Sequence, residues 1–358
     1  MGETNYFSYM AARNGKIRIK DIDEMAGVSE GSVDRILHKR GNVSKKSEAK
    51  IRAVLDKINY KPNKYASVLA SNKQWKLAYL IPESQGSPYW TQVEQGIRKA
   101  ADEIINLNVS IEGHHFNQFD ETSFQNAINE LKESDFDGLV YSPAFKEPAE
   151  AFARHLEVFQ KPYALIDSDL PDNSPTCYYG QHSLQSGYIA AKLLYPWLEG
   201  NGILVVHFKH EKQAIQNQVA ARFKGFMNFV NEHLQGTPIR EVEISADNGD
   251  ALKKTLAEFH PDACVVFNSK AHLVADLLKE QTHKGIRLIG YDTIPENVKR
   301  MKDGDIWCLI GQRPESQGFN AIKSLADLMV FQSKPSRTNY MPIDILMGEN
   351  IDYYCDLD

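Results

Sequence analysis

Apolar residues recur every three or four positions in three short segments near the N-terminus. This spacing is typical of amphipathic helices that each turn one apolar face toward a shared core. The apolar positions are Ile22, Met25 and Ala26 in the first segment, Val33, Ile36 and Leu37 in the second, and Ile51, Val54, Leu55 and Ile58 in the third. The pattern predicts a small all-α domain over residues 16–62.

The residues between the first two predicted helices are those that end one helix and begin another. Gly27 interrupts the first helical pattern, and Ser29 is a good N-cap for the second helix, which runs from Glu30 to about His38. Ser44 is the expected N-cap of the third helix. Two short helices joined by such a turn form a helix-turn-helix, whose second helix fits the major groove of DNA.

From Lys76 onward, short apolar runs alternate with helical stretches in two successive sets. Strands that alternate with helices predict parallel sheets covered on both faces. The predicted strands are Leu77–Ile81, Val109–Phe116, Leu139–Tyr141 and Tyr163–Ile166 in the first set, and Ile203–Phe208, Ile239–Ile244, Ala263–Phe267 and Ile286–Gly290 in the second. We therefore expect an α/β body of two doubly wound lobes, with a ligand beyond the carboxyl ends of the strands.

The net charge of −6 for the whole chain conceals an asymmetry. Residues 16–76 contain 15 Lys and Arg against 7 Asp and Glu, a net charge of +8, and residues 1–15 are neutral overall, so residues 77–358 carry −14. A basic N-terminal domain on an acidic body suggests that only the former meets a polyanion. On charge alone, a solvated charged surface is the alternative.

The composition, with 42% apolar and 25% charged residues, is that of a soluble globular protein. No window approaches the roughly 18 uninterrupted apolar residues that a membrane span needs. We expect no cofactor and no metal site, because no group of His, Cys and carboxylate residues has metal-ligand spacing. The four cysteines, which form no Cys-x-x-Cys pair and are expected to be buried free thiols in a reducing cytoplasm, are Cys177, Cys264, Cys308 and Cys355.

Several motifs of the N-terminal domain follow one another without a gap. They are Ile19-Lys20-Asp21-Ile22, Ala26-Gly27-Val28-Ser29, Ser32-Val33-Asp34-Arg35-Ile36-Leu37, Val43-Ser44 and Asn59-Tyr60-Lys61-Pro62-Asn63. In order and spacing they resemble the headpiece of the LacI family of transcription regulators. The DNA-binding residues that the resemblance implies are Lys20, Ser29, Glu30, Gly31, Ser32, Asp34, Arg35, His38, Asn63, Tyr65, Ala66 and Leu69.

The same resemblance implies that Asn63–Ala70 forms a hinge helix on operator DNA. Leu69 would then enter the minor groove as an apolar wedge, which kinks the duplex at a cost offset by the contacts that the bend permits. An ordinary linker leucine is the alternative.

Asp34 departs from the family pattern, which has a small hydroxyl residue at this position. It lies four residues after Glu30, a like-charge spacing that costs a few tenths of a kcal/mol. Asp34 either accepts a hydrogen bond from a cytosine amino group or pairs with Arg35 or Lys39. These alternatives leave the operator sequence open.

The body resembles the periplasmic-binding-protein-like sensor domain of the same family (the type I fold). The effector-binding residues that this implies are Tyr89, Trp90, Ser142, Asp167, Arg222, Asn268, Asp292 and Gln312. Core packing is the alternative for Trp90, and a structural ion pair is the alternative for Arg222 and Asp292. Gln181-His182 stands where an Asp-Asn pair is common in the family, so the identity of the ligand is not implied.

The expected organisation is a flexible arm over residues 1–15, a headpiece over 16–62, a hinge helix and linker over 63–75, and an effector-binding and dimerisation domain over 76–358. Lobe one is expected at about 76–180 and 310–337, and lobe two at about 181–309 and 338–358. The resemblance implies a cytoplasmic homodimer that binds operator DNA. It would act as a ligand-responsive regulator, commonly a repressor, of carbohydrate-utilisation genes and sense a sugar-like molecule.

Two other classes of protein use the fold of this body. A solute-binding protein of a sugar uptake system needs export and no DNA-binding domain, whereas Met1 to Gly15 lack a secretory pattern and a basic helix-turn-helix follows. An enzyme would need catalytic motifs. The sequence contains no Gly-x-Gly-x-x-Gly, no Gly-Lys-Ser/Thr loop and no Gly-x-Ser-x-Gly. We therefore expect a regulator without enzymatic activity.

Overall fold

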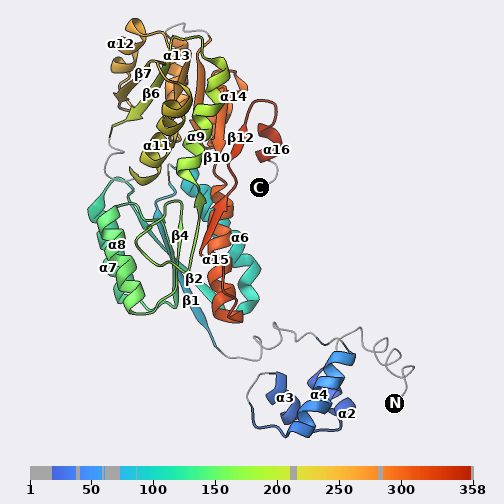
Figure 1. Cartoon of the computed structure of the whole chain (residues 1–358). Coiled ribbons are helices and arrows are strands. Elements are labelled where there is room, and N and C mark those ends of the chain that lie inside the picture. Colours follow the sequence, from blue (N-terminus) through green and yellow to red (C-terminus); the bar gives the residue numbers. More distant parts are fainter. Residues whose placement is uncertain are drawn as a thin grey trace. The chain divides into compact units, whose positions relative to one another are not determined.

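The computed structural model describes residues 18–37, 41–58, 60, 73–85, 87–209, 216–280 and 285–355. The chain divides into two compact units, Met1–Ser71 and Asn72–Asp358, which we treat separately (Figure 1). The expected arm at residues 1–15 and the hinge helix at Asn63–Ala70 lie outside the described residues. Within the described part of the chain, no helix has the length and apolar character needed to cross a membrane.

The first unit contains the three predicted helices, α2 (Ile19–Ala26), α3 (Glu30–Leu37) and α4 (Lys45–Lys57). Their core comprises Ile22, Ala26, Val33, Ile51 and Ile58, which are all apolar positions of the predicted helical pattern. The all-α prediction for this domain is confirmed.

Two predicted helix boundaries have a clear local cause. Gly27 follows α2 with φ of 60°, a left-handed conformation that glycine adopts without a Cβ penalty. The hydroxyl of Ser44 accepts a hydrogen bond of 3.1 Å from the amide of Ser47, which caps α4 as predicted.

The second unit contains two six-stranded sheets, one in each lobe. The first sheet has the order β11-β5-β4-β3-β1-β2 and the second has the order β12-β10-β9-β8-β6-β7. The bounds are β1 (Trp75–Pro82), β2 (Val109–Phe116), β3 (Gly138–Tyr141), β4 (Tyr163–Ile166), β5 (Cys177–Gln181), β6 (Ile203–Phe208), β7 (Ile239–Ile244), β8 (Ala263–Val265), β9 (Arg287–Tyr291), β10 (Cys308–Gly311), β11 (Thr338–Met341) and β12 (Asp344–Leu346). All the pairings are parallel except that of β10 with β12.

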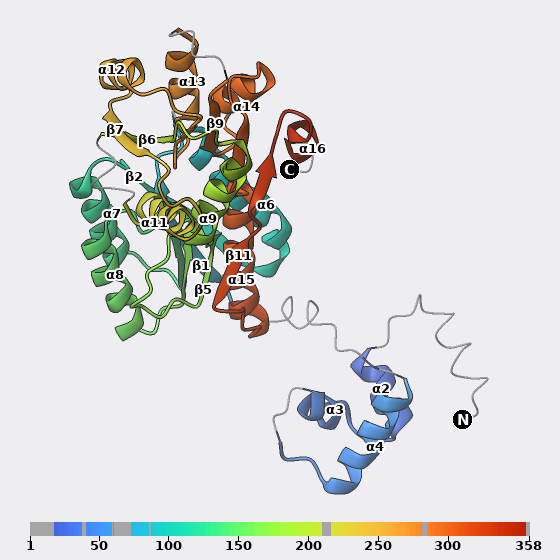
Figure 2. The same ribbon diagram turned by 45° about the horizontal axis from the view of Figure 1, so that its top comes forward.

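Helices cover both faces of each sheet, as the alternating pattern predicted. In lobe one, α7 and α8 lie on one side of the sheet and α6 and α15 lie on the other (Figure 1). In lobe two, α9 and α11 lie side by side over one face, and α12, α13 and α14 pack with the other (Figure 2). The bounds are α6 (Pro88–Ile104), α7 (Glu121–Glu133), α8 (Lys146–Val158), α9 (Ser183–Leu194), α11 (Gln216–His233), α12 (Asp250–Glu258), α13 (Ala271–Glu280), α14 (Pro295–Lys302), α15 (Pro314–Phe331) and α16 (Ile351–Cys355).

The predicted lobe boundaries near the C-terminus are wrong at two places. Residues 310 and 311 belong to β10 of the second sheet, and residues 338–341 form β11 of the first sheet. The chain passes between the lobes after β5, after β10 and after β11. The third crossover comes after residue 341 because β11 pairs with the edge of β5 before the chain leaves lobe one.

Candidate functional site

Arg222, Gln312 and Asp292 form a buried network where the strands of lobe two end. Arg222 lies on α11 and is 2% exposed; its guanidinium donates to the carbonyl of Phe267 at 2.7 Å and to the side-chain oxygen of Gln312. The Gln312 amide in turn donates to the carboxylate of Asp292. Gln312 therefore stands between the two charged groups, and a three-residue network replaces the simple ion pair that was the alternative for Arg222 and Asp292.

Asp167 is the corresponding carboxylate of lobe one. It directly follows β4, as Asp292 directly follows β9, and the two residues have φ values of 67° and 70°. Asp tolerates this left-handed conformation better than most residues, although the strain still costs on the order of 1 kcal/mol. The hydroxyl of Tyr89, from the first turn of α6, donates to the Asp167 carboxylate at 2.6 Å.

Two glutamines that the sequence analysis did not select join the lobes. Gln218, on α11, accepts from Arg222 at 2.8 Å and donates across the cleft to the carbonyl of Asp167. Gln317, on α15, accepts from the Asp167 amide at 2.9 Å and donates to the carbonyl of Gln312 at 2.9 Å. Both lie on helices, as the candidates Tyr89 and Arg222 do, but the family pattern did not point to them. The spacing of Gln218 and Arg222, four residues apart on one helix face, was the available signal.

The network holds ionisable groups away from water. Burial raises the pKa of the Asp292 carboxyl to about 6, against the opposing effect of the Arg222 charge. Burial also raises the pKa of the Asp167 carboxyl, which the Tyr89 hydrogen bond and Arg222 oppose. Titratable groups perturbed in this way concentrate at functional sites, because a site built only for stability would avoid buried charge.

An open cavity of about 430 Å³ lies beside this network. Asp167, Ser168 and Tyr178 line it from lobe one, and Ser183 and Gln218 line it from lobe two. It is therefore a cleft between the lobes, at the carboxyl ends of the strands where the fold predicts a ligand.

The remaining predicted effector residues lie at different places. Trp90 and Ser142 are 5% and 2% exposed, and both line a small pocket that shares the wall formed by Asp167 and Ser168. The Trp90 indole donates to Gln118 at 3.2 Å. Asn268 accepts from the amide of Lys270 at 2.9 Å, in the loop after β8.

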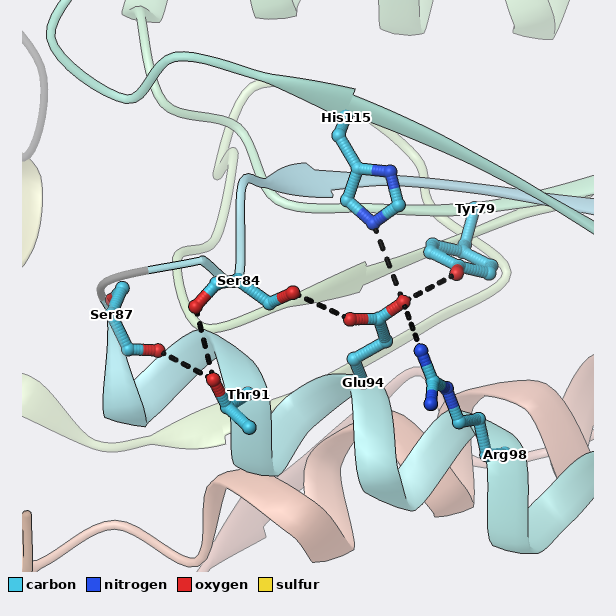
Figure 3. Close-up of polar contacts among 7 residues, drawn as sticks. All are labelled: Tyr79, Ser84, Ser87, Thr91, Glu94, Arg98 and His115. Carbon is cyan, nitrogen blue, oxygen red and sulfur yellow. Dashed lines mark hydrogen bonds and ion pairs between the residues drawn. The ribbon is translucent and has the colours of Figure 1, made fainter.

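Buried Glu94 connects the N-terminal half of α6 to the sheet through hydrogen bonds (Figure 3). Its carboxylate accepts from the hydroxyl of Ser84 at 2.7 Å, from Tyr79 at 3.2 Å and from Arg98 at 3.1 Å, and His115 lies 3.6 Å away. Burial raises the pKa of Glu94, but the hydrogen bonds from Ser84 and Arg98 outweigh it and hold the pKa below the usual value. The cluster fixes the turn between β1 and α6, which leads directly to Tyr89 and Trp90.

Close helix packing sets the position of Arg222. A Cβ at Gly187 of α9 would overlap the backbone carbonyl of Arg222, and a Cβ at Gly225 of α11 would overlap that of Leu184. Lobe one has the same close packing of two helices, because a Cβ at Gly96 of α6 would overlap the carbonyl of Glu315 on α15. The glycines let each helix pair approach at backbone distance beside the cleft.

In the helix-turn-helix unit, the predicted DNA-contacting residues on the described helices lie on the solvent side. The exposed ones are Lys20, Ser29, Glu30, Gly31 and Arg35, and those of intermediate burial are Ser32 and Asp34. His38, Asn63, Tyr65, Ala66 and Leu69 lie outside the described residues.

Comparison with known families matches both units. The model of bacterial regulatory proteins of the lacI family matches residues 18–63, and the model of the periplasmic binding protein domain matches residues 78–333. The ribose operon repressor of Halalkalibacterium halodurans is 22% identical over 289 residues, which cover 77% of this chain and 80% of that protein. The regulator DegA of Bacillus subtilis is 25% identical, over 77% of this chain and 82% of its own length.

Solved structures share the fold of the body. A protein described as a LacI transcriptional regulator from Bacteroides fragilis superimposes with a TM-score of 0.73 and 33% identity, over 79% of this chain and 100% of its own. The glucose-galactose binding protein GanP of Geobacillus stearothermophilus has a TM-score of 0.65 at 19% identity, over 78% and 99% of the two chains, and shows the fold alone. With the helix-turn-helix and sensor-domain models both matched, the chain belongs to the lacI family of bacterial regulatory proteins.

Proposed function

We propose that this regulator represses carbohydrate-utilisation genes and that a small polyhydroxylated effector, held between its two lobes, controls its binding to operator DNA. The observation that carries the proposal is the buried network across the cleft, in which Tyr89 and Asp167 of lobe one approach Arg222 and Asp292 of lobe two. Charged donors and acceptors suit vicinal hydroxyls, and the aromatic face of Tyr89 or Trp90 suits an apolar sugar face.

The relatives support the choice of ligand class. Two of them are named ribose operon repressors, and sugar-binding proteins are among the structures with the same fold. An uptake protein remains the second candidate for the body, but the lacI-family match at residues 18–63 favours a regulator over both an uptake protein and an enzyme.

The proposed DNA contacts are the solvent-facing residues of the helix-turn-helix, together with the hinge residues implied by the family pattern, Leu69 among them. Each recognition helix would contact one half-site, so the protein would bind as a homodimer to a near-palindromic operator. It would act in the cytoplasm. A ligand that binds better to one lobe orientation shifts the population of DNA-binding states by its difference in affinity and by no more than that.

The test combines an effector screen with a variant. Thermal-shift measurements on the full chain identify a stabilising sugar, and operator fragments selected from random DNA report whether that sugar releases or recruits the protein. Arg222→Lys keeps the positive charge but loses the planar fork that binds Phe267 and Gln312. We expect effector affinity to fall about tenfold to a hundredfold while operator affinity without effector stays within about threefold. A variant that lost operator binding and effector binding equally would show that Arg222 is structural.

A further inference from the structure

Gln218 joins the two walls of the cleft through a hydrogen bond that belongs to none of the three crossovers. Its amide nitrogen, on α11 of lobe two, donates to the carbonyl of Asp167 on lobe one, and both residues line the cavity. Gln218 is 5% exposed, so the bond lies in surroundings that strengthen it relative to a bond in water. A turn of the lobes that widens the cavity moves its walls apart and breaks this bond.

The bond completes a chain of contacts that runs from one lobe to the other. The side-chain oxygen of Gln218 accepts from Arg222 at 2.8 Å, and Arg222 donates to the carbonyl of Phe267 at 2.7 Å. On lobe one, the Asp167 carboxylate accepts from the hydroxyl of Tyr89 at 2.6 Å. One amide therefore connects α11 and the end of the second sheet, through its oxygen, with the end of the first sheet and α6, through its nitrogen.

The crossovers are held together by contacts of their own. The amide of Gln181, at the end of β5, donates to the carbonyl of Gly311 at 2.8 Å and to that of Pro342 at 3.4 Å, so it links all three crossovers. Arg313 donates twice to the carboxylate of Asp344, at 2.8 and 3.1 Å. Because residues at a hinge move least when two lobes turn, these contacts are compatible with more than one lobe orientation. The bond across the cavity is specific to this one.

We propose that the bond from Gln218 to Asp167 is a latch, which holds the lobes in this orientation in a substantial share of the effector-free molecules. The inference rests on the proposed function, in which the effector bridges residues of both lobes, Asp167 and Arg222 among them. Such a ligand favours the orientation in which these residues approach each other, which is the orientation that the latch stabilises. Loss of the latch therefore changes operator binding in the direction opposite to the effector.

This relation holds for either response to the effector. If the effector releases the regulator from DNA, loss of the latch strengthens operator binding in the effector-free protein. If the effector recruits the regulator to DNA, loss of the latch weakens that binding. In both cases the Kd for the effector rises, because fewer effector-free molecules have the orientation that binds it.

The experiment uses two variants of the full-length protein that differ in which end of the amide they preserve. Gln218→Glu keeps an oxygen for Arg222 and places a second oxygen opposite the carbonyl of Asp167, so it removes the latch alone. Gln218→Met keeps the approximate length of the side chain and loses both bonds. Asn228→Asp is the control for the added charge, because residue 228 lies ten residues, about 15 Å, further along α11.

Fluorescence anisotropy with labelled operator gives the operator affinity with and without effector, and calorimetry gives the Kd for the sugar identified by thermal shift. A buried hydrogen bond between neutral groups changes an equilibrium constant by about threefold to tenfold. We expect both Gln218 variants to shift the effector-free operator affinity against the direction of the effector and to raise the Kd for the effector. The two factors should multiply to at least about threefold, and Asn228→Asp should change neither by more than about 1.5-fold.

Several results would overturn the latch. If the effector-free operator affinity stays within about 1.5-fold while the Kd for the effector rises, Gln218 is only a ligand contact. If Gln218→Met shifts both quantities and Gln218→Glu shifts neither, the residue only orients Arg222. A lower Kd for the effector in both variants would mean that the amide competes with the effector.

Failure of the proposed function has a different signature, since no sugar then binds the native protein. The latch is then tested on the effector-free chains by hydrogen exchange and mass spectrometry. Its loss should speed exchange at least about twofold in the loop after β4 and at the start of α9, because both segments line the cavity. Rates equal to those of the native protein and of Asn228→Asp would overturn the latch independently of any effector.

Discussion

Asp167 and Asp292 occupy corresponding positions in the two lobes, each at the first residue after a strand. Each combines a left-handed backbone, a buried carboxyl and a raised pKa. All three features oppose stability, since strain and buried charge are both unfavourable. Their repetition in both lobes supports the proposal that the cleft binds a ligand, at some expense of stability.

The pH dependence of the free energy of unfolding measures the cost of burying the Asp292 carboxylate. Its pKa is raised to about 6 in the folded protein, so the folded state holds the proton more tightly than the unfolded chain does. Protonation of the Asp292 carboxyl stabilises the folded state by up to about 3 kcal/mol. This contribution is fully present below pH 4 and is lost as the pH rises to about 6. Asp292→Asn removes this titration. We expect the stability of the variant relative to the native protein to increase between pH 4 and pH 7, measured by urea unfolding.

The comparison of the two proteins at each pH cancels the titration of all other groups. A relative stability that stays constant from pH 4 to pH 7 would show that the Asp292 carboxyl is ionised with an ordinary pKa in the folded state.

The sequence pattern points to the candidate residues that follow strands, such as Asp292 after a clear apolar run. It did not predict Gln218 and Gln317, because a glutamine on a helix usually faces solvent and the pattern carries no sign of what the helix packs against. Their role follows from the approach of α11 and α15 to the cleft, which is a property of the tertiary structure.

Among the elements, the strands found from sequence are those with strong apolar runs, such as β1 and β6. The strands β5, β10, β11 and β12 were not predicted. β11 has the sequence Thr-Asn-Tyr-Met and is half exposed, so its hydrogen bonds to β5, and not an apolar pattern, define it as a strand. The two errors in the lobe boundaries have the same origin.

The packing of α9 against α11 depends on Gly187. Ala at this position would place a methyl group on the backbone carbonyl of Arg222, which no side-chain rotation relieves. We expect Gly187→Ala to destabilise the protein by about 1–3 kcal/mol and to weaken effector binding, because α11 carries Arg222 and Gln218. Urea unfolding and titration with the effector measure the two effects. Gly348→Ala is the control, with its nearest contact at 4.0 Å, and a similar loss there would contradict the packing argument.

The turn between β1 and α6 depends on Glu94. In Glu94→Gln one of the donors, Ser84, Tyr79 or Arg98, would face an amide NH₂ in place of an oxygen. We expect a loss of about 1–3 kcal/mol on thermal or urea unfolding. Glu103→Gln on the same helix is the matched control, because Glu103 is 56% exposed and pairs with Lys323 at 3.3 Å. Its expected effect is within about 0.5 kcal/mol. Equal effects of the two variants would mean that the buried cluster adds nothing.

The whole molecule divides its two tasks between units of opposite charge. The three-helix unit has its own core, and the sequence around it is basic, whereas the two-lobed body is acidic and contains the cleft. Binding of the effector and binding of the operator then affect each other only by changing the populations of the conformational states of the body. Linkage requires that the factor by which the effector changes the affinity for the operator equals the factor by which the operator changes the affinity for the effector.

Salt should separate the two activities. Operator binding by a headpiece region of net charge +8 releases counterions from the phosphates, so its affinity should fall on the order of 10³-fold between 50 and 200 mM salt. A neutral effector releases none, and its Kd should change less than about threefold over the same range.

Removal of residues 1–71, which leaves β1 and both sheets intact, should abolish DNA binding and preserve the thermal shift with effector. Fluorescence anisotropy with labelled operator and calorimetry with effector measure both arms. If the isolated body retained salt-dependent DNA binding, the division of tasks between the basic and acidic units would be wrong.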